Sequence, residues 1–180
     1  MAGKTTYYRR LQVILELSAS EKPSDKEAFL AGINRKSPPN FVYHRWDPKR
    51  KERVGITSSG AILGTFNLAV RLGIIEEETG RLTSVGKEAA DQTRFDIVIT
   101  KQLDKIFKLL GFSITKIEEE SGKMLRKNDI VLPTADKLYV SVFDNQEPEI
   151  SILYFRTLMR LLAACGGINT SRRQLYLPKK

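Results

Sequence analysis

One stretch decides how the first half of this chain is interpreted: LGIIEEETGRLTSVGKEAAD, residues 72–91. Gly73 suits the end of a helix, because glycine readily adopts the left-handed conformation in which many helices terminate. On either side of a Thr-Gly turn at 79–80, the runs 74–78 and 81–85 predict two short antiparallel strands. The stretch therefore predicts a helix, a small hairpin and another helix in succession.

Three segments upstream of this stretch have the apolar spacing of amphipathic helices. Residues 7–18 and 58–72 each carry apolar side chains at about every third or fourth position. A further helix is expected near residues 24–34, where Ser24 is a suitable N-cap and Glu27 completes a capping box. The first half thus predicts three helices, then the hairpin, then a short helix.

Residues 35–57 connect the second and third of these helices and contain three prolines, which interrupt helices. We expect a long loop here, and loops of this length in a compact domain are often functional. Five basic residues gather in it: Arg45, Lys49, Arg50, Lys51 and Arg53. They are placed to contact a phosphate backbone, with Trp46 stacking on a base or sugar. The alternative is a solvated loop whose tryptophan joins the core.

The second half repeats this order of elements. Helices are expected over residues 97–111 and 148–165, the latter with Pro148 in its first turn. A second hairpin is expected over residues 168–178, with its tip near Ser171 and Arg172.

The two halves can be aligned on their hairpins. Placing Gly73 on Gly167 gives an offset of 94 residues (167 − 73). A repeat of element types at one offset favours two copies of a small unit. We therefore predict two domains, residues 1–92 with the long basic loop 35–57, and residues 93–180.

Three helices followed by a hairpin are similar to the winged helix-turn-helix superfamily. In that family a reading helix ends at Leu-Gly, an Ile-containing strand with acidic residues follows, and a Leu-Thr strand leads through Gly-Lys-Glu into a helix. The matching residues here are Leu72, Gly73, Ile74, Ile75, Glu76, Glu77, Glu78, Gly80, Leu82, Thr83, Gly86, Lys87 and Glu88. The second half resembles the family in element order alone. The resemblance implies a mostly α fold with small β-hairpins (α+β), built as two tandem winged-helix units, which bind DNA or protein.

Composition narrows the function classes. The 180 residues carry a net charge of +9, which divides into +4 for residues 1–92 (15 basic minus 11 acidic) and +5 for residues 93–180 (15 minus 10). A basic excess shared by both halves favours a polyanionic partner such as nucleic acid. No apolar run reaches the ~20 residues of a membrane helix, and the single cysteine is typical of a reducing cytoplasm. One histidine and one cysteine leave few residues for a zinc site or a catalytic triad, so we expect no enzyme, no metal site and no cofactor; the alternative is a metal site built only of carboxylates.

The helix expected over residues 58–72 is the candidate for reading DNA bases. Its start and one stripe along it carry the candidate residues: Ser58, Ser59, Gly60, Gly64, Asn67 and Arg71. Asparagine pairs with adenine and arginine with guanine in the major groove, glycines permit close approach, and the serines can hold a phosphate at the helix start. The structural alternatives are that a serine is only an N-cap and that the glycines allow close helix packing.

Three further arginines complete the candidate set, because they lie beside the expected hairpin turns: Arg81, Arg172 and Arg173. The acidic run at 76–78 repels phosphate, so the first hairpin is not expected to lie flat along DNA.

We predict a non-catalytic protein that binds duplex DNA, either as a transcriptional regulator or as the recognition subunit of a larger DNA-processing system. The alternative is a winged-helix module for protein–protein interaction. It is favoured by the low charge of the helix at 58–72 and by the apolar helix at 148–165, which is a candidate contact for a homodimer or a larger complex. Single-stranded RNA binding through Trp46 and the basic loop is a third hypothesis.

Overall fold

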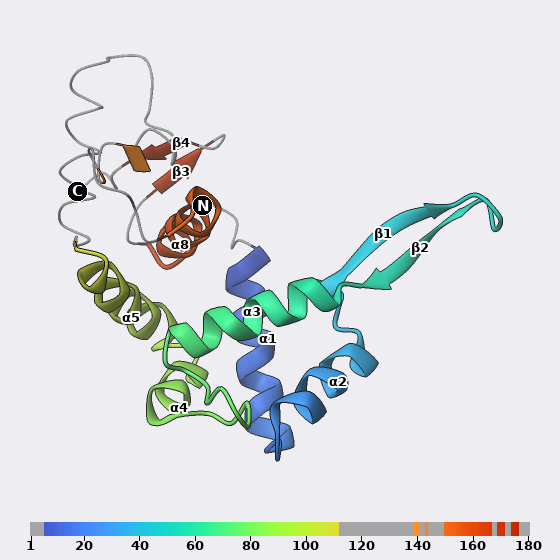
Figure 1. Ribbon diagram of the computed structural model, residues 1–180, viewed down its shortest axis with the longest axis horizontal. Coiled ribbons are helices and arrows are strands. Elements are labelled where there is room, and N and C mark those ends of the chain that lie inside the picture. Colours follow the sequence, from blue (N-terminus) through green and yellow to red (C-terminus); the bar gives the residue numbers. More distant parts are fainter. Residues whose placement is uncertain are drawn as a thin grey trace. The chain divides into compact units, whose positions relative to one another are not determined.

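The computed structural model describes residues 6–111, 139–140, 143, 150–166, 169–171 and 174–176. The chain divides into two units: Tyr8–Gln92, here the N-terminal unit, and the described residues from Thr93 onward together with Thr6 and Tyr7, here the C-terminal unit. Most described residues are helical, and two antiparallel hairpins accompany the helices (Figure 1). The expected fold class, mostly α with small β-hairpins, is confirmed for this part of the chain.

The N-terminal unit contains most of the described elements. In chain order they are α1 (Thr6–Glu21), α2 (Lys26–Lys36), the 3-10 turn η1 (Pro39–Phe41), β1 (Val42–Asp47), β2 (Glu52–Thr57), α3 (Ser59–Arg71) and α4 (Ser84–Ala90). The first three expected helices are therefore confirmed, each within a few residues of the expected bounds.

Apolar side chains from α1, α2 and α3 form the core of this unit. Leu11 and Ile14 of α1 are fully buried, as are Phe29 of α2 and Phe66 of α3, whose ring centroids lie 6.1 Å apart. Burial of each such side chain is worth about 1.5–3 kcal/mol, so this shared core holds the three helices together.

The expected capping box of α2 is wrong. Asp25, not Ser24, is the N-cap, and its carboxylate accepts a hydrogen bond of 2.7 Å from the backbone N–H of Ala28. The hydroxyl of Ser24 instead donates to Asp25 over 3.0 Å. A carboxylate is the stronger acceptor for the exposed N–H groups at a helix start, so the helix begins one residue later than expected.

The loop expected over residues 35–57 is also wrong, because most of it forms a β-hairpin. All six residues of β1 pair with β2, from Val42 opposite Thr57 to Asp47 opposite Glu52. The prolines lie at the boundaries: Pro39 begins η1, and Pro48 lies in the turn between the strands. The β-branched and aromatic residues on each side of Pro48 were the missed strand signal.

The hairpin expected over residues 74–85 is reduced to a single β-bridge between Ile75 and Leu82. The second expected strand, 81–85, is wrong because Thr83 is the N-cap of α4 and accepts a hydrogen bond of 3.0 Å from the N–H of Gly86. Helix α4 approaches the bridge closely there: a Cβ at Gly86 would lie 1.8 Å from the Ile74 carbonyl oxygen.

The turn of this reduced hairpin folds back onto α1 and α2. Gly80 is buried, and its carbonyl accepts a hydrogen bond of 2.6 Å from the Ser18 hydroxyl. The backbone N–H of Lys26 donates to the Glu78 carbonyl over 2.8 Å. This turn is thus part of the packed unit and is not a projecting wing.

The C-terminal unit contains α5 (Phe95–Leu109), α8 (Ile152–Ala164), β3 (Asn169–Ser171) and β4 (Gln174–Tyr176). Strands β3 and β4 form the expected second hairpin. Helix α8 starts later than the expected residue 148, because Ser151 is its N-cap and accepts a hydrogen bond of 3.2 Å from the N–H of Tyr154. Pro148 lies outside the described residues.

Candidate nucleic-acid interface

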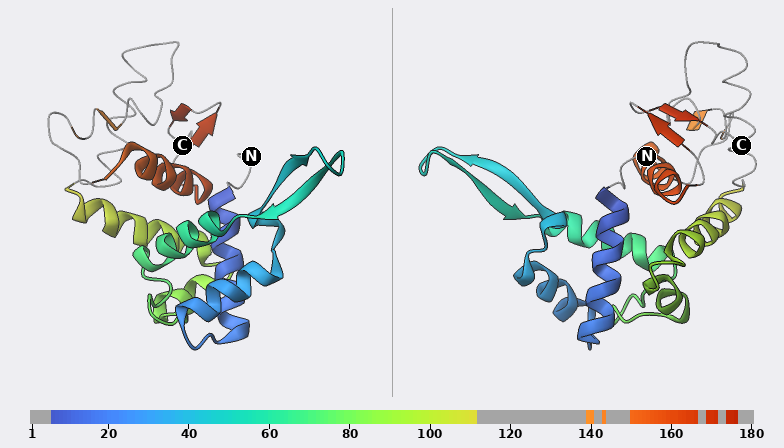
Figure 2. Two further views of the ribbon diagram at one scale, coloured as in Figure 1. Left: turned by 45° about the vertical axis from the view of Figure 1, so that its right-hand side comes forward. Right: turned by 180° about the vertical axis from the view of Figure 1, so that it is seen from behind.

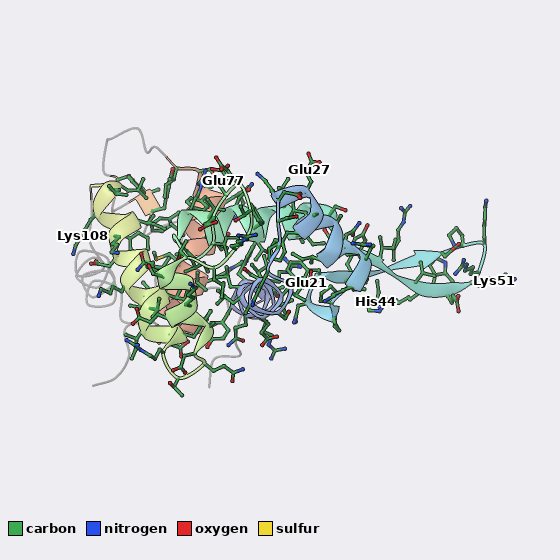
Figure 3. All side chains as sticks on the ribbon, turned by 90° about the horizontal axis from the view of Figure 1, so that it is seen from below. Glu21, Glu27, His44, Lys51, Glu77 and Lys108 are labelled. Atoms are coloured by element: carbon green, nitrogen blue, oxygen red, sulfur yellow. The ribbon has the colours of Figure 1, made fainter. Side chains whose placement is uncertain are left out.

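A two-stranded arm, residues 42–57, extends away from the helices of the N-terminal unit (Figure 1, Figure 2). At about 3.4 Å per residue, its six paired residues span roughly 20 Å. Figure 3 shows Lys51 at the outer end of the arm and His44 nearer the helices. The segment expected to be a loop is therefore an ordered extension.

The turn at the tip of the arm has a defined local structure. The carboxylate of Asp47 accepts hydrogen bonds from the backbone N–H groups of Lys49 (2.8 Å) and Arg50 (3.3 Å). Such a side-chain acceptor stabilises a turn by replacing a backbone partner. Lys51 closes the turn in the left-handed conformation, with φ +56°. The side chains of these basic residues are exposed, so the tip presents cations to solvent.

The two faces of the arm differ in charge. Trp46 lies opposite Arg53, and His44 lies opposite Gly55, so these side chains share one face, which carries no carboxylate. On the other face the pair nearest the tip is Asp47 and Glu52. Because phosphate is repelled by carboxylates, the face of Trp46 and Arg53 is the better nucleic-acid surface.

Two aromatic side chains of the arm are exposed to an unusual degree. Trp46 is 57% exposed and Tyr43 is 50% exposed. The sequence alternative, a tryptophan buried in the core, is therefore wrong. The arm also carries five basic residues against two acidic ones, and the 3.8 Å contact of Asp47 with Arg50 is an exposed pair of little energetic value.

The base of the arm is joined to the start of α3. The N–H of Ser58 donates to the Phe41 carbonyl over 2.9 Å, and the hydroxyls of Ser37 and Thr57 are hydrogen-bonded to each other. The Ser58 hydroxyl accepts a hydrogen bond of 3.2 Å from the N–H of Ala61. Ser58 is therefore the N-cap of α3, the alternative that the sequence left open, while Ser59 is exposed.

The exposed residues of α3 define its outer face: Ser59, Gly60, Leu63, Gly64, Asn67 and Arg71. They include all four residues of the expected stripe, Gly60, Gly64, Asn67 and Arg71. A Cβ at Gly60 or Gly64 would meet no atom within 4 Å. Close helix packing is thus excluded as the reason for either glycine in this unit. Helix α3 has no acidic residue, so its outer face is smooth and free of negative charge.

Arg81 lies in a different environment from the rest of the candidate set. Its Nε donates a hydrogen bond of 2.8 Å to the Pro23 carbonyl, beside the end of α1. Its position on a projecting wing is contradicted, because the turn that carries it packs against α1 and α2. The structure thus joins the candidates on the arm to those on α3 but does not add Arg81 to them.

The remaining candidates belong to the C-terminal unit. Arg172 and Arg173 lie outside the described residues. The apolar face of α8 is used within the unit: Phe155, Leu158, Met159, Leu161 and Leu162 are all buried. The Phe155 ring contacts Tyr139 and Phe143, with centroids 5.3 and 6.0 Å away. Little of the surface expected to hold a homodimer or a larger-complex partner is left exposed, although Leu153 is 66% exposed.

Comparison of the chain with protein-family profiles, curated proteins and solved structures finds no match. In the described part of the chain, no helix has the length and apolarity needed to cross a bilayer. The same residues contain no group of three or more histidine, cysteine, aspartate or glutamate side chains arranged to hold a metal ion.

Proposed function

We propose that this chain binds duplex DNA without chemistry of its own, through the arm and the outer face of α3. It would serve as a transcriptional regulator or as the recognition subunit of a DNA-processing system. In this proposal the arm follows the phosphate backbone, and α3 presents Asn67 and Arg71 to base edges in the major groove.

The observation that supports this proposal most is the arm itself. An isolated two-stranded hairpin is marginally stable in water, and this one exposes Trp46 and five basic side chains while adding little to the core. At its base the arm is held by the hydrogen bonds between Ser58 and Phe41 and between Thr57 and Ser37. Exposed cations can neutralise the charge of a polyanionic partner, and an exposed aromatic ring can stack on a base, whereas neither contributes much to the stability of the fold.

The outer face of α3 adds a second argument. Glycine in a helix interior costs about 0.5–1 kcal/mol relative to alanine. Gly64, in the interior of α3, carries this cost, and open space lies above both Gly64 and Gly60, which is in the first turn. Glycines at these positions would let a partner, such as the floor of the major groove, come close to the α3 backbone.

The relation to winged helices is part of the same proposal. Helices α1, α2 and α3 followed by the Ile75–Leu82 bridge have the winged-helix order, and α8 followed by β3 and β4 ends the C-terminal unit in a similar way. In place of the first wing, which packs inward, we propose that the arm contacts the backbone. Arg172 and Arg173 stay predictions for the second hairpin.

The test is the salt dependence of binding to a random-sequence duplex pool. Affinity should fall with salt, with a log–log slope of about −0.9 for each phosphate neutralised. The variant with Lys49, Arg50, Lys51 and Arg53 all changed to Ala should flatten that slope by about 2–4. Enrichment of particular sequences at higher salt would indicate base reading by α3.

A matched control removes the same number of charges elsewhere: Arg9, Lys101, Lys105 and Lys108, all changed to Ala. This variant should keep the slope of the unmodified chain. The proposal fails if no duplex is bound at low ionic strength, or if both variants lose slope equally. Preference for single-stranded RNA over duplex would support the third hypothesis instead.

One observation favours the alternative function, a protein-interaction module. Leu63 is 43% exposed and lies between Gly60 and Gly64 on the outer face of α3, a combination that suits the close packing of a partner helix. Under this alternative, the quadruple arm variant keeps its protein partner and Leu63→Ser loses it. The two variants are compared by immobilising each one and measuring how much of the protein partner it retains.

A further inference from the structure

A second concentration of positive charge lies in a groove of the N-terminal unit, away from the arm. The groove has a volume of about 510 Å³ and is lined by Ser18, Ala19, Lys22, Arg81, Leu82 and Lys87, here the basic groove. These residues come from the end of α1, the segment before α4, and α4. The volume is within the range of about 300–1,000 Å³ typical of small-molecule sites.

Three cations from separate parts of the chain line the basic groove, and none of the described residues that line it has a carboxylate. Within the described residues, neither Lys22 nor Lys87 forms an ion pair. By contrast, Lys26 in the same unit lies 3.9 Å from Glu77. The convergence of uncompensated positive charge raises the free energy of the empty groove, and a bound anion would lower it.

The backbone around Arg81 is held in place by hydrogen bonds. Its Nε donates to the Pro23 carbonyl, its own N–H donates to the Thr79 hydroxyl over 3.1 Å, and Ser18 holds the adjoining Gly80 carbonyl. In the described part of the chain, the two terminal guanidinium nitrogens of Arg81 have no protein partner. The guanidinium is therefore oriented, with donors left for a ligand.

Lys22 occupies its position at a conformational cost. Its φ is +46°, in the left-handed region that favours glycine, and its N–H donates to the Ser18 carbonyl over 3.3 Å. Glycine would end α1 with less strain. The Lys22 side chain is nevertheless present here, and it lines the basic groove.

We propose that the basic groove binds a small organic anion: a carboxylate or phosphate ester with an apolar body. The three cations would hold the anionic group, and Ala19, Leu82 and the aliphatic parts of the lysines would contact the apolar body. This site does not depend on the proposed DNA binding, since none of its residues lies on the arm or on α3.

The test uses the ¹⁵N-labelled full chain and two probes of equal shape, anionic 1-naphthoate and neutral 1-naphthamide. We expect saturable shifts from 1-naphthoate in the backbone amides of Ala19, Lys22, Leu82 and Lys87, and little response to the amide. Lys22→Gly and Lys87→Gln should each weaken 1-naphthoate binding about tenfold. Lys22→Gly is the sharper variant, because glycine suits the φ of this position and the fold should be kept.

Arg9→Gln, at the other end of α1, is the matched control and should leave the affinity for 1-naphthoate unchanged. The quadruple arm variant should also keep it, which separates this site from the proposed DNA interface. The proposal is overturned if the shifts do not saturate, if 1-naphthamide binds equally well, or if inorganic phosphate alone binds as tightly. It is also overturned if a duplex displaces 1-naphthoate from these amides, because the groove would then be a second DNA contact.

Discussion

The ring of Phe29 occupies the space in which a side chain at Gly80 would lie. A Cβ at Gly80 would stand 2.6 Å from Cδ1 of Phe29, closer than real side chains approach one another. Gly80 also has φ +75°, a conformation that disfavours every residue with a Cβ. This contact anchors the turn at 79–80 to α2, so the turn belongs to the core and the arm is the projecting hairpin of the unit.

Gly80→Ala should therefore destabilise the chain by about 2–4 kcal/mol, the sum of the left-handed backbone cost and the displacement of Phe29. Urea unfolding followed by circular dichroism measures the change. Gly73→Ala is the matched control, because Gly73 has φ +67° with no atom within 4 Å of its would-be Cβ. It should cost only the backbone term, about 1–2 kcal/mol. Equal losses at the two positions would show that Phe29 does not anchor the turn.

Gly60→Ala and Gly64→Ala should have the opposite effect on stability. Gly64 lies in the helix interior with open space around it, so Gly64→Ala should raise the free energy of unfolding by about 0.5–1 kcal/mol, and Gly60→Ala, in the first turn, should raise it by less. If α3 enters a groove closely, the double variant should nonetheless bind duplex about tenfold more weakly. If the double variant is more stable but binds duplex with unchanged affinity, α3 is not part of the interface. The proposed interface would then consist of the arm only.

Trp46 offers a direct reporter of the arm, because it is the single tryptophan of the chain. Its fluorescence should have the emission of a solvent-exposed indole in the free protein, and duplex binding should shift or quench it. Trp46→Ala should change stability by no more than about 0.5 kcal/mol, since the side chain is 57% exposed. The same variant should bind duplex about tenfold more weakly. If the Trp46 emission does not change at a saturating concentration of duplex, the arm lies outside the interface.

Asp25 gives a prediction about pH. The N–H of Ala28, followed by the Ser24 hydroxyl, donates to its carboxylate and holds the pKa of Asp25 below the usual 3.8. Because the folded pKa is the lower one, ionised Asp25 stabilises the native state above pH 3.8, and this contribution is lost as the pH falls through the folded pKa. Asp25→Asn caps the helix without titrating. The stability of the unmodified chain relative to this variant should thus decline as the pH falls below about 5. Urea midpoints of the two proteins that change equally with pH would contradict this prediction.

Much of the helical architecture could be predicted from local sequence. The apolar spacing of α1, α3 and α5 gave helices close to those in the structure, because a 3.6-residue period is a strong signal over more than ten residues. The residues of α3 that the sequence placed on one stripe are indeed exposed together. Pro38, Pro39 and Pro48 predict an irregular segment, yet they lie outside the two strands of the arm and therefore do not interrupt it.

The sequence by itself determined the helices, the basic excess and the cations between residues 45 and 53, since composition and periodicity are properties of neighbouring residues. Only the tertiary structure decided which hairpin projects. The turn at 79–80 has a better local hairpin signal than residues 42–57. It nevertheless packs into the core, through contact with Phe29 and hydrogen bonds from Ser18 and Lys26. Burial of a turn depends on side chains more than fifty residues away, as the Ser18 to Gly80 hydrogen bond shows. The same long-range packing brings Lys22, Arg81 and Lys87 to one groove, which no local pattern indicates.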